Sequence, residues 1–594
     1  MLPIAIIGAL FFFLFSLGKP AIIAMLIAIF IQTRGAKLEL PKINFTAYSL
    51  SPQSGTPFAG QLTALLFLAL LFFLVARSSS DGLISSPWSL LPSFFLPLFF
   101  LATVLLIFLM YKKSSSFFPA LYFLMFFGVA AIIYKLGYGF DQFVHEAGQN
   151  YILAHGTISP KSLQYIGLYS INIFLNQAAG IQIATLNRFL LPILSMIIVP
   201  ICYFSFKKEN KDISTLALLA ILFLPFSSFI VSTPQGVANL LLLLLIFINH
   251  KGWALPLTIL LIHPITGIIA IIYQALVNFR FKKIIIIAGA LAIPLAFSAL
   301  SFKYGGLHIN FYLWDALKDY ASFLTAGGLQ KNYNIFLDLI YLLQFLTVPI
   351  LIAISVWTAI KFKKELNLYP FYLFLISTAS FFITRIFVDF SYLISYEQKN
   401  YPERIFVISL IFLAPYLVFA ANRFISFIEK REITYKVFFI LLFAFVLTAN
   451  FYLTYPRFDN YKNDKGKNLT SDMLYAVEAV KRDANNKDYV VLTDQTVSAG
   501  ALKLDGFKKY YSTPLGDVFY YPIPTGGPLY NEFLNLVYNN AGSRAAQNAK
   551  ILTGAQEAYI ILPSYWENYK KIKENLLLEM KPVLENENIA VLKL

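Results

Sequence analysis

Long apolar tracts recur along most of this 594-residue chain and constrain its fold more than any other feature. A helix needs about 20 residues to cross roughly 30 Å of hydrocarbon. Tracts of about that length lie at 61–77, 88–110, 117–135, 183–205, 213–231, 284–302, 333–360, 369–388, 404–422 and 434–454. Because the bilayer interior offers no partner for backbone polar groups, each tract is expected to be helical. The sequence therefore predicts a multi-pass α-helical membrane protein.

The composition excludes several other classes of protein. Hydrophobic residues make up 58% of the chain and charged residues 13%, whereas about 25% of the residues of a soluble domain are charged. Cys202 is the one cysteine, so a disulfide scaffold is excluded. The formal charge of +16 is explained by Lys and Arg in cytoplasmic loops, and no nucleic-acid partner is expected.

Basic residues in short loops predict the topology, because such loops stay on the cytoplasmic side. Lys251 and Arg280 both lie in basic loops, so the segment 253–278 between them must cross the membrane an even number of times. It is predicted to be a hairpin broken at His263-Pro264, because proline disfavours helical geometry in the preceding residue. The interrupted tract 2–32 is either one kinked helix or two short ones, and the total comes to about 13 to 15 spans.

The apolar tracts and the sides of the membrane assigned to their loops predict three parts in the chain. Residues 1–116 are additional N-terminal transmembrane segments, and residues 117–454 form a transmembrane module with outer loops at 136–182, 303–332 and 389–403. Residues 455–594 change composition and contain a polar helix pattern at 471–481 and buried-strand runs at 489–492, 559–562 and 589–592. They predict a soluble extracytoplasmic α/β domain on a multi-pass protein of the plasma membrane.

Ionisable residues at the apolar boundary are costly and are therefore candidates for function. Those on the predicted outer side are Asp141, His145, Glu146, His155, Arg188, His263, Arg385, Asp389, Glu397, Glu403 and Arg404. Residues 140–151 predict an interfacial helix whose Phe140, Val144 and Ala147 can face the membrane surface, with Asp141 in its first turn. Each residue also has a structural alternative: Asp141 favours a helix start, and the cations can snorkel or form ion pairs, for instance Arg385 with Asp389.

Three features of the sequence resemble a known family. They are the order of spans, outer loops and tail, the run Gly139-Phe140-Asp141-Gln142-Phe143-Val144-His145-Glu146-Ala147, and the hairpin His263-Pro264-Ile265-Thr266-Gly267. Over roughly 117–455 the chain resembles the GT-C superfamily, which includes protein mannosyltransferases, aminoarabinose transferases and oligosaccharyltransferases. The resemblance implies a usually inverting membrane glycosyltransferase that moves a sugar from a polyprenyl-phosphate-linked donor, among membrane lipids, to an extracytoplasmic protein, lipid or glycan acceptor.

The resemblance implies a role for Asp141 alone, and the chemistry of the transfer suggests the other residues. Asp141 is the expected general base, with Glu146 and His145 as weaker candidates. The expected groups for the donor phosphate are, in order, Arg385, Arg404, Arg188 and His263. Oligosaccharyltransferase-like members generally carry an Asp-x-Asp pair in an outer loop, whereas Asp315 and Asp319 are one helical turn apart here. No metal ligand or certain cofactor is therefore predicted, and a divalent cation at Asp141, His145 and Glu146 stays an alternative.

Two other functions remain open. A transporter or lipid flippase would use the same charges along a substrate path, and it predicts charges at the bilayer midplane and two related halves of the chain. A non-catalytic membrane assembly scaffold would bind its partner through the tail, so the substitution of Asp141 would leave its activity intact.

Overall fold

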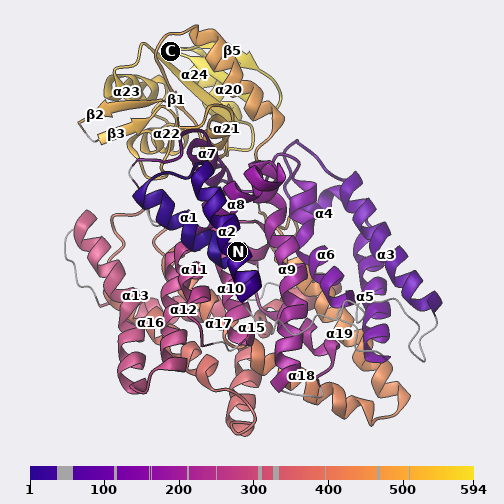
Figure 1. The fold of residues 1–594 in the computed structure, drawn as a ribbon. Coiled ribbons are helices and arrows are strands. Elements are labelled where there is room, and N and C mark those ends of the chain that lie inside the picture. The colour runs from indigo at the N-terminus through magenta and orange to yellow at the C-terminus, as the bar shows by residue number, and fades with distance from the viewer. Residues whose placement is uncertain are drawn as a thin grey trace. The chain divides into compact units, whose positions relative to one another are not determined.

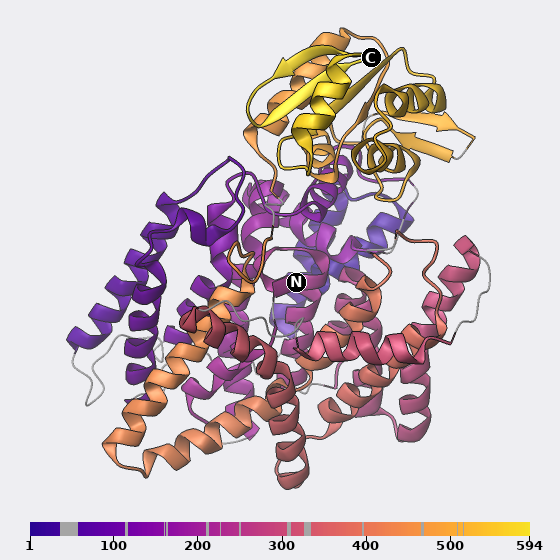
Figure 2. The ribbon, with the colours of Figure 1, turned by 180° about the vertical axis from the view of Figure 1, so that it is seen from behind.

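The structure, a computed structural model, describes residues 1–35, 58–112, 117–159, 161, 164–209, 213–225, 227–248, 251–305, 311–325, 334–394, 397–464, 468–507, 509–514 and 516–594. The chain forms two compact units (Figures 1 and 2). The first unit comprises Met1–Ser78, Leu90–Ile132 and Ser159–Lys462, and the second comprises Ser79–Ser89, Ile133–Ile158 and Asn463–Leu594. The predicted boundaries after residues 116 and 454 stay predictions.

The first unit is built from helices. In chain order they are α1 (Leu2–Leu14), α2 (Lys19–Gly35), α3 (Phe58–Arg77), α5 (Phe95–Lys112), α6 (Phe117–Ile133), α8 (Ile166–Ala179), α9 (Ile183–Glu209), the 3-10 helices η2 (Thr215–Phe223) and η3 (Ser227–Ile230), α10 (Pro234–Ile248), α11 (Ala254–Ile262), α12 (Pro264–Asn278), α13 (Lys282–Gly305), α14 (Leu313–Thr325), α15 (Ile335–Lys361), α16 (Tyr369–Phe387), α17 (Asn400–Ile411), α18 (Ala414–Glu429) and α19 (Ile433–Thr454). A short helix, α4 (Pro87–Leu90), lies where the two units join along the chain.

Six helices of the described residues are long and apolar enough to cross a membrane: α3, α9, α13, α15, α16 and α19. The number of candidate spans rises to seven if the bent pair α17–α18 counts as one span. Six shorter apolar helices of 10–17 residues are also present among the described residues. This agrees with the prediction of a multi-pass helical membrane protein, and the total of 13 to 15 spans stays a prediction. The tract 2–32 contains two helices, α1 and α2, separated near Gly18.

Two predicted spans have a different form. The tract 213–231 is not one α-helix, because the 3-10 helices η2 and η3 occupy it and Pro225 lies between them. All residues from Thr215 to Leu222 are buried, so the apolar composition of η2 is explained by burial within protein. The tract 404–422 is bent by 41° between α17 and α18, at Phe412 and Leu413.

The predicted break at His263-Pro264 is confirmed, and the membrane crossings of the segment 253–278 stay a prediction. Helix α11 ends at Ile262, His263 is extended, and α12 starts at Pro264. The two helices approach very closely at one point, because a Cβ atom built on Gly267 would lie 2.1 Å from the Cα of Leu260. Only glycine fits this crossing without moving the backbone of the facing helix.

The Gly267→Ala substitution is therefore expected to lower the free energy of unfolding by about 1–3 kcal/mol, because the added methyl group must push α11 and α12 apart. Gly128→Ala in α6 is the matched control, since a Cβ atom there meets nothing within 4 Å. The control should be neutral or stabilise by up to about 1 kcal/mol, as expected for alanine within a helix. Denaturant unfolding of both variants in detergent measures the difference, and equal stabilities would contradict the close crossing.

The second unit contains a mixed α/β domain. Its elements are α7 (Asp141–His155), α20 (Ser471–Ala484), β1 (Tyr489–Leu492), α21 (Gln495–Asp505), β2 (Tyr510–Thr513), β3 (Gly516–Phe519), α22 (Pro528–Tyr538), α23 (Ser543–Thr553), β4 (Glu557–Pro563), α24 (Tyr569–Leu577), β5 (Lys581–Glu585) and β6 (Ile589–Lys593). The main sheet has the order β1-β4-β6-β5, with β1 and β4 parallel and the other pairs antiparallel. The predicted helix and three predicted strands of the tail are confirmed as α20, β1, β4 and β6.

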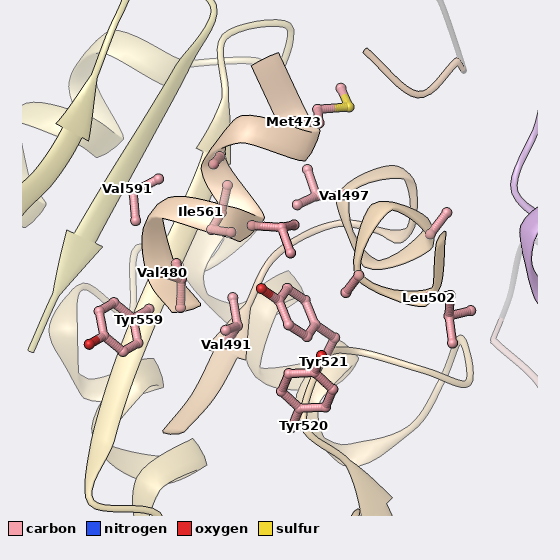
Figure 3. Packing of buried hydrophobic residues seen from close by; sticks show 14 of the residues in the cluster. Met473, Val480, Val491, Val497, Leu502, Tyr520, Tyr521, Tyr559, Ile561 and Val591 are labelled. Carbon is pink, nitrogen blue, oxygen red and sulfur yellow. The ribbon is translucent and has the colours of Figure 1, made fainter. Parts of the chain in front are cut away.

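One core of this unit lies where α20 and α21 cover the sheet. Val491, Tyr559, Ile561 and Val591 of the strands meet helix residues such as Val480 there (Figure 3). Helix α7 joins the same core through Phe143 and Ala147, while Phe140 and Val144 pack against it. The expectation that Phe140, Val144 and Ala147 face the membrane surface is therefore wrong, because these side chains pack against tail residues that lie over 300 positions later in the chain.

Candidate functional site

The three residues expected to carry catalysis lie on α7 and have different environments. Asp141, in the first turn, is exposed to solvent. Glu146 is buried, and its Oε1 lies 3.5 Å from the Nζ of Lys503 on α21. The same Nζ lies 5.4 Å from the centre of the Phe143 ring. Glu146 therefore takes part in joining α7 to α21, whereas the Asp141 carboxylate is accessible.

The third residue, His145, is half-buried. Burial lowers the pKa of His145 to about 4, and the nearby Asp141 carboxylate opposes this shift. The imidazole is consequently uncharged at neutral pH. An uncharged imidazole can accept a proton or a hydrogen bond, but it adds no positive charge for a phosphate.

The first of the predicted phosphate-binding residues, Arg385, lies in the last turn of α16 and is part of an ion-pair cluster. Its Nε lies 2.6 Å from Oδ2 of Asp319 on α14, and Nζ of Lys399 lies 2.8 Å from the other carboxylate oxygen. Burial alone would raise the pKa of Asp319, but the hydrogen bonds from Lys399 and Arg385 outweigh it and hold that pKa below its usual value. Arg385 does not pair with Asp389, whose carboxylate accepts hydrogen bonds from Ser391.

The other three predicted phosphate-binding residues also make contacts in the first unit. Arg188 donates two hydrogen bonds to the carbonyl of Ala131, at 2.6 and 3.2 Å. The guanidinium of Arg404 lies 5.5 Å from the centre of the Tyr401 ring. His263 is buried and caps α12, where its Nδ1 lies 3.0 Å from Oγ1 of Thr266.

A cavity of about 520 Å³ lies in the first unit, and its lining includes the start of α17 and the end of α19. The walls also come from α14, α15 and the segment that joins η2 to η3. Its polar lining consists of Ser227, Ser322, Gln344, Thr347, Glu403, Asn450, Thr454, Arg457 and Lys462. Its apolar lining consists of Phe223, Leu224, Pro225, Phe323, Val348, Phe406, Val407 and Leu453. The cavity therefore combines a carboxylate, two cations and an apolar wall.

Two of these residues, Arg457 and Lys462, belong to a turn that is fixed to α15. Asp459, between them, accepts hydrogen bonds from the hydroxyl groups of Tyr341 and Tyr452 and from the backbone amides of Tyr461 and Lys462. Burial alone would raise the pKa of Asp459, but these hydrogen bonds hold it below its usual value. The turn is thereby held against the helix that carries Gln344.

The guanidinium of Arg457 is positioned by the same helix. Its Nη1 donates to Oε1 of Gln344 at 3.1 Å, and its Cζ lies 5.2 Å from the centre of the Tyr341 ring. The hydroxyl of Tyr461 donates to Asp338. Asp338, Tyr341 and Gln344 are spaced three residues apart and so lie along one face of α15. This face and the turn hold a largely buried cation at the wall of the cavity.

Helix ends connect the cavity to the predicted phosphate-binding residues. Four hydrogen bonds form this connection. In order, they join the residue after α19 to α6, α9 to α6, α9 to the residues before α10, and α12 of the hairpin to α10. The hydrogen bonds are Tyr455 Oη to Phe126 O at 2.7 Å, Arg188 to Ala131 O, Leu191 N to Ser232 Oγ at 3.0 Å, and Thr266 Oγ1 to Asn239 Oδ1 at 3.0 Å. Arg385 and Arg404 lie at the facing ends of α16 and α17. These contacts join Arg188 and His263 to neighbouring helices, while Arg404 is next in sequence to Glu403, which lines the cavity.

Arg457, Asp459 and Lys462 were not predicted from the sequence. The signal for Arg457 was present, because it lies three residues after the end of the span at 434–454 and is therefore an ionisable group at an apolar boundary. The assignment of all residues after 454 to the soluble tail concealed it. Nothing in the sequence links Asp459 to Tyr341, which lies 118 positions earlier.

Within the described part of the chain, no three His, Cys, Asp or Glu side chains gather closely enough to hold a metal ion. Asp141, His145 and Glu146 have the unequal exposures given above, and a divalent cation there stays a prediction. No protein-family model, curated protein or solved structure compared with the chain matches it.

Proposed function

We propose that this protein is a membrane glycosyltransferase that moves a sugar from a polyprenyl-phosphate-linked donor to an extracytoplasmic acceptor. The observation that carries the proposal is the cavity at the helix ends of the first unit, where Glu403, Arg457 and Lys462 lie beside an apolar wall. A lipid-linked sugar phosphate has an apolar chain, an anionic phosphate and sugar hydroxyl groups, which correspond to the three kinds of lining.

The donor phosphate would be held by Arg457 and Lys462. A guanidinium presents donors in a fork that matches phosphate oxygens, and it is more effective where water is limited. Arg457 is 8% exposed, and its guanidinium is held at the cavity wall by Gln344 and Tyr341. Arg385 is a weaker candidate for the phosphate than Arg457 or Lys462, because its guanidinium is already paired with Asp319. Arg404, Arg188 and His263 remain candidates for donor contacts.

The transfer requires one base and one leaving group. The acceptor hydroxyl oxygen forms a bond to the anomeric carbon while the bond from that carbon to the phosphate oxygen breaks, and the phosphate leaves with the electron pair. A single displacement of this kind inverts the anomeric configuration. The acceptor proton passes to a carboxylate. The resemblance to the GT-C superfamily implies Asp141 for this role, and Glu403 is the carboxylate that lines the cavity. Glu403 would accept hydrogen bonds from the donor sugar.

The cellular placement is part of the proposal. The basic loops favour a plasma-membrane protein of about 13 to 15 spans with its tail outside the cytoplasm. The acceptor would then be a protein, a lipid or a cell-surface glycan. Polyprenyl-phosphate carriers place the sugar at headgroup depth, and the cavity lies at helix ends, which agrees with that depth.

The experiment that tests this function uses the full-length protein in vesicles with radiolabelled polyprenyl-phosphate sugars and a mixture of envelope glycans, lipids and proteins. We expect label to pass from the lipid fraction to an acceptor, and Arg457→Gln to raise KM for the donor by at least about tenfold, the loss expected for one charged hydrogen bond. Arg544→Gln, an exposed arginine of the second unit, is the control. Lack of transfer from every lipid-linked donor, together with movement of the lipid between leaflets, would support a flippase instead.

A further inference from the structure

Helix α14 has three distinct faces. Ala316, Asp319, Tyr320 and Phe323 face the body of the unit; the first two are buried, and the rings of the last two contact Phe381 and Phe406. Asp315, Lys318 and Ser322 form a polar strip. Leu313, Trp314, Leu317 and Ala321 form an exposed apolar strip, and the Trp314 side chain is 74% exposed. The spacing of 3 and 4 residues along the last strip places these side chains on one side of the helix.

The start of α14 is fixed at the level where a candidate membrane span ends. The backbone N–H of Tyr312 donates to the carbonyl of Ile386 at 3.1 Å. The rings of Phe311 and Phe387 lie 5.9 Å apart. Phe387 is the last residue of α16, one of the six helices able to cross a membrane in the described part of the chain. The helix therefore begins beside the end of a candidate membrane span.

The length of α14 does not allow it to span the bilayer itself. Its 13 residues extend about 20 Å at 1.5 Å per residue, and its inner face carries an aspartate. That aspartate, Asp319, is held by Arg385 at the end of α16 and by Lys399 just before α17. The two ion pairs fix the middle of α14 to the ends of two neighbouring helices, so its apolar strip points away from them.

We infer that α14 is an interfacial helix that inserts Leu313, Trp314 and Leu317 into the boundary between headgroups and acyl chains. An exposed strip of this kind, continuous with Phe311 and with Phe387 of a candidate span, is covered by lipid in a membrane protein. Tryptophan and tyrosine are enriched at this depth because their rings are apolar and their ends can bond to water. Because Ser322 and Phe323 of the same helix line the cavity, lipid lies directly beyond one cavity wall. The inference rests on the candidate spans and does not depend on sugar transfer.

The test measures the depth of Trp314 with brominated lipids. In a variant with Trp88, Trp253, Trp357 and Trp566 replaced by Phe, the full-length protein is placed in phosphatidylcholine vesicles with bromines near the glycerol or near the chain ends. We expect stronger quenching by the shallow bromines and a depth about 5–10 Å below the headgroups, as for interfacial helices. A second variant that keeps only Trp566, in the second unit, is the control and should not be quenched by either lipid.

A labelled cysteine provides the same measurement without removing four tryptophans. Trp314→Cys introduces one accessible thiol, since Cys202 is buried, and a polarity-sensitive label there should shift its emission to the blue in vesicles. Asp315→Cys, on the polar strip, is the matched position and should report water. Quenching of Trp314 by aqueous iodide but by neither lipid, or equal emission at positions 314 and 315, would overturn the inference.

Discussion

Replacing Asp141 by Asn is expected to lower kcat for sugar transfer by at least about 100-fold, which is the usual contribution of a general base. The change keeps the size of the side chain and its place in the first turn of α7, but removes the group that accepts a proton. KM for the donor should change little, because an interaction made only in the transition state affects kcat and kcat/KM equally. Initial rates of transfer in vesicles over a range of donor concentrations measure both constants.

Glu146→Gln is the control for this experiment. Glu146 is on the same helix but is buried beside Lys503, so its substitution should lower the unfolding temperature and leave kcat unchanged. Glu403→Gln tests the other carboxylate, which lines the cavity. If Asp141→Asn kept the full rate while Glu403→Gln abolished it, the base would be Glu403. If both variants kept the full rate, the transferase proposal would be wrong.

The second large effect concerns the ion-pair cluster of α14. Asp319→Asn is expected to lower the free energy of unfolding by about 3 kcal/mol, because it removes one partner of a buried pair and leaves the Arg385 guanidinium without its counter-charge. The side chains of Asp319 and Arg385 are 8% and 18% exposed, so solvent screens the pair only weakly. Denaturant titration in detergent, followed by circular dichroism, measures this loss.

Two variants at nearby positions separate this effect from a general sensitivity of α14. Asp315→Asn lies one turn earlier on the exposed polar strip and should cost less than about 0.5 kcal/mol. Lys399→Met removes the more exposed cation, whose side chain is 58% exposed, and should cost no more than about 1 kcal/mol. A loss at Asp315 as large as that at Asp319 would contradict the assignment of the ion pairs as the cause.

Local signals made a large part of the fold predictable. The break at His263-Pro264 follows from the effect of proline on the residue before it, and the structure places the ends of α11 and α12 there. The strands of the tail were marked by short runs such as Tyr489 to Leu492, with polar residues on either side. The tract 213–231 was misleading because composition does not distinguish a helix covered by lipid from one covered by protein.

Less of the candidate site was predictable, because its contacts join distant parts of the chain. The partner of Arg385 is Asp319, 66 positions away, whereas the sequence offered the nearer Asp389. The association of α7 with the tail depends on Phe143 and Ala147 fitting a core made mostly by residues after 468. An apolar strip on a helix does not reveal whether lipid or protein covers it.

The most direct test of the proposed donor site is photolabelling with a polyprenyl-phosphate analogue that carries a diazirine beside the phosphate. After irradiation of the full-length protein in vesicles, mass spectrometry should find the label within α17 near Glu403 or in the segment from Leu453 to Lys462. Natural donor should compete with this labelling, and Arg457→Gln should reduce it. Labelling that avoids both segments, or that natural donor does not displace, would contradict the central claim.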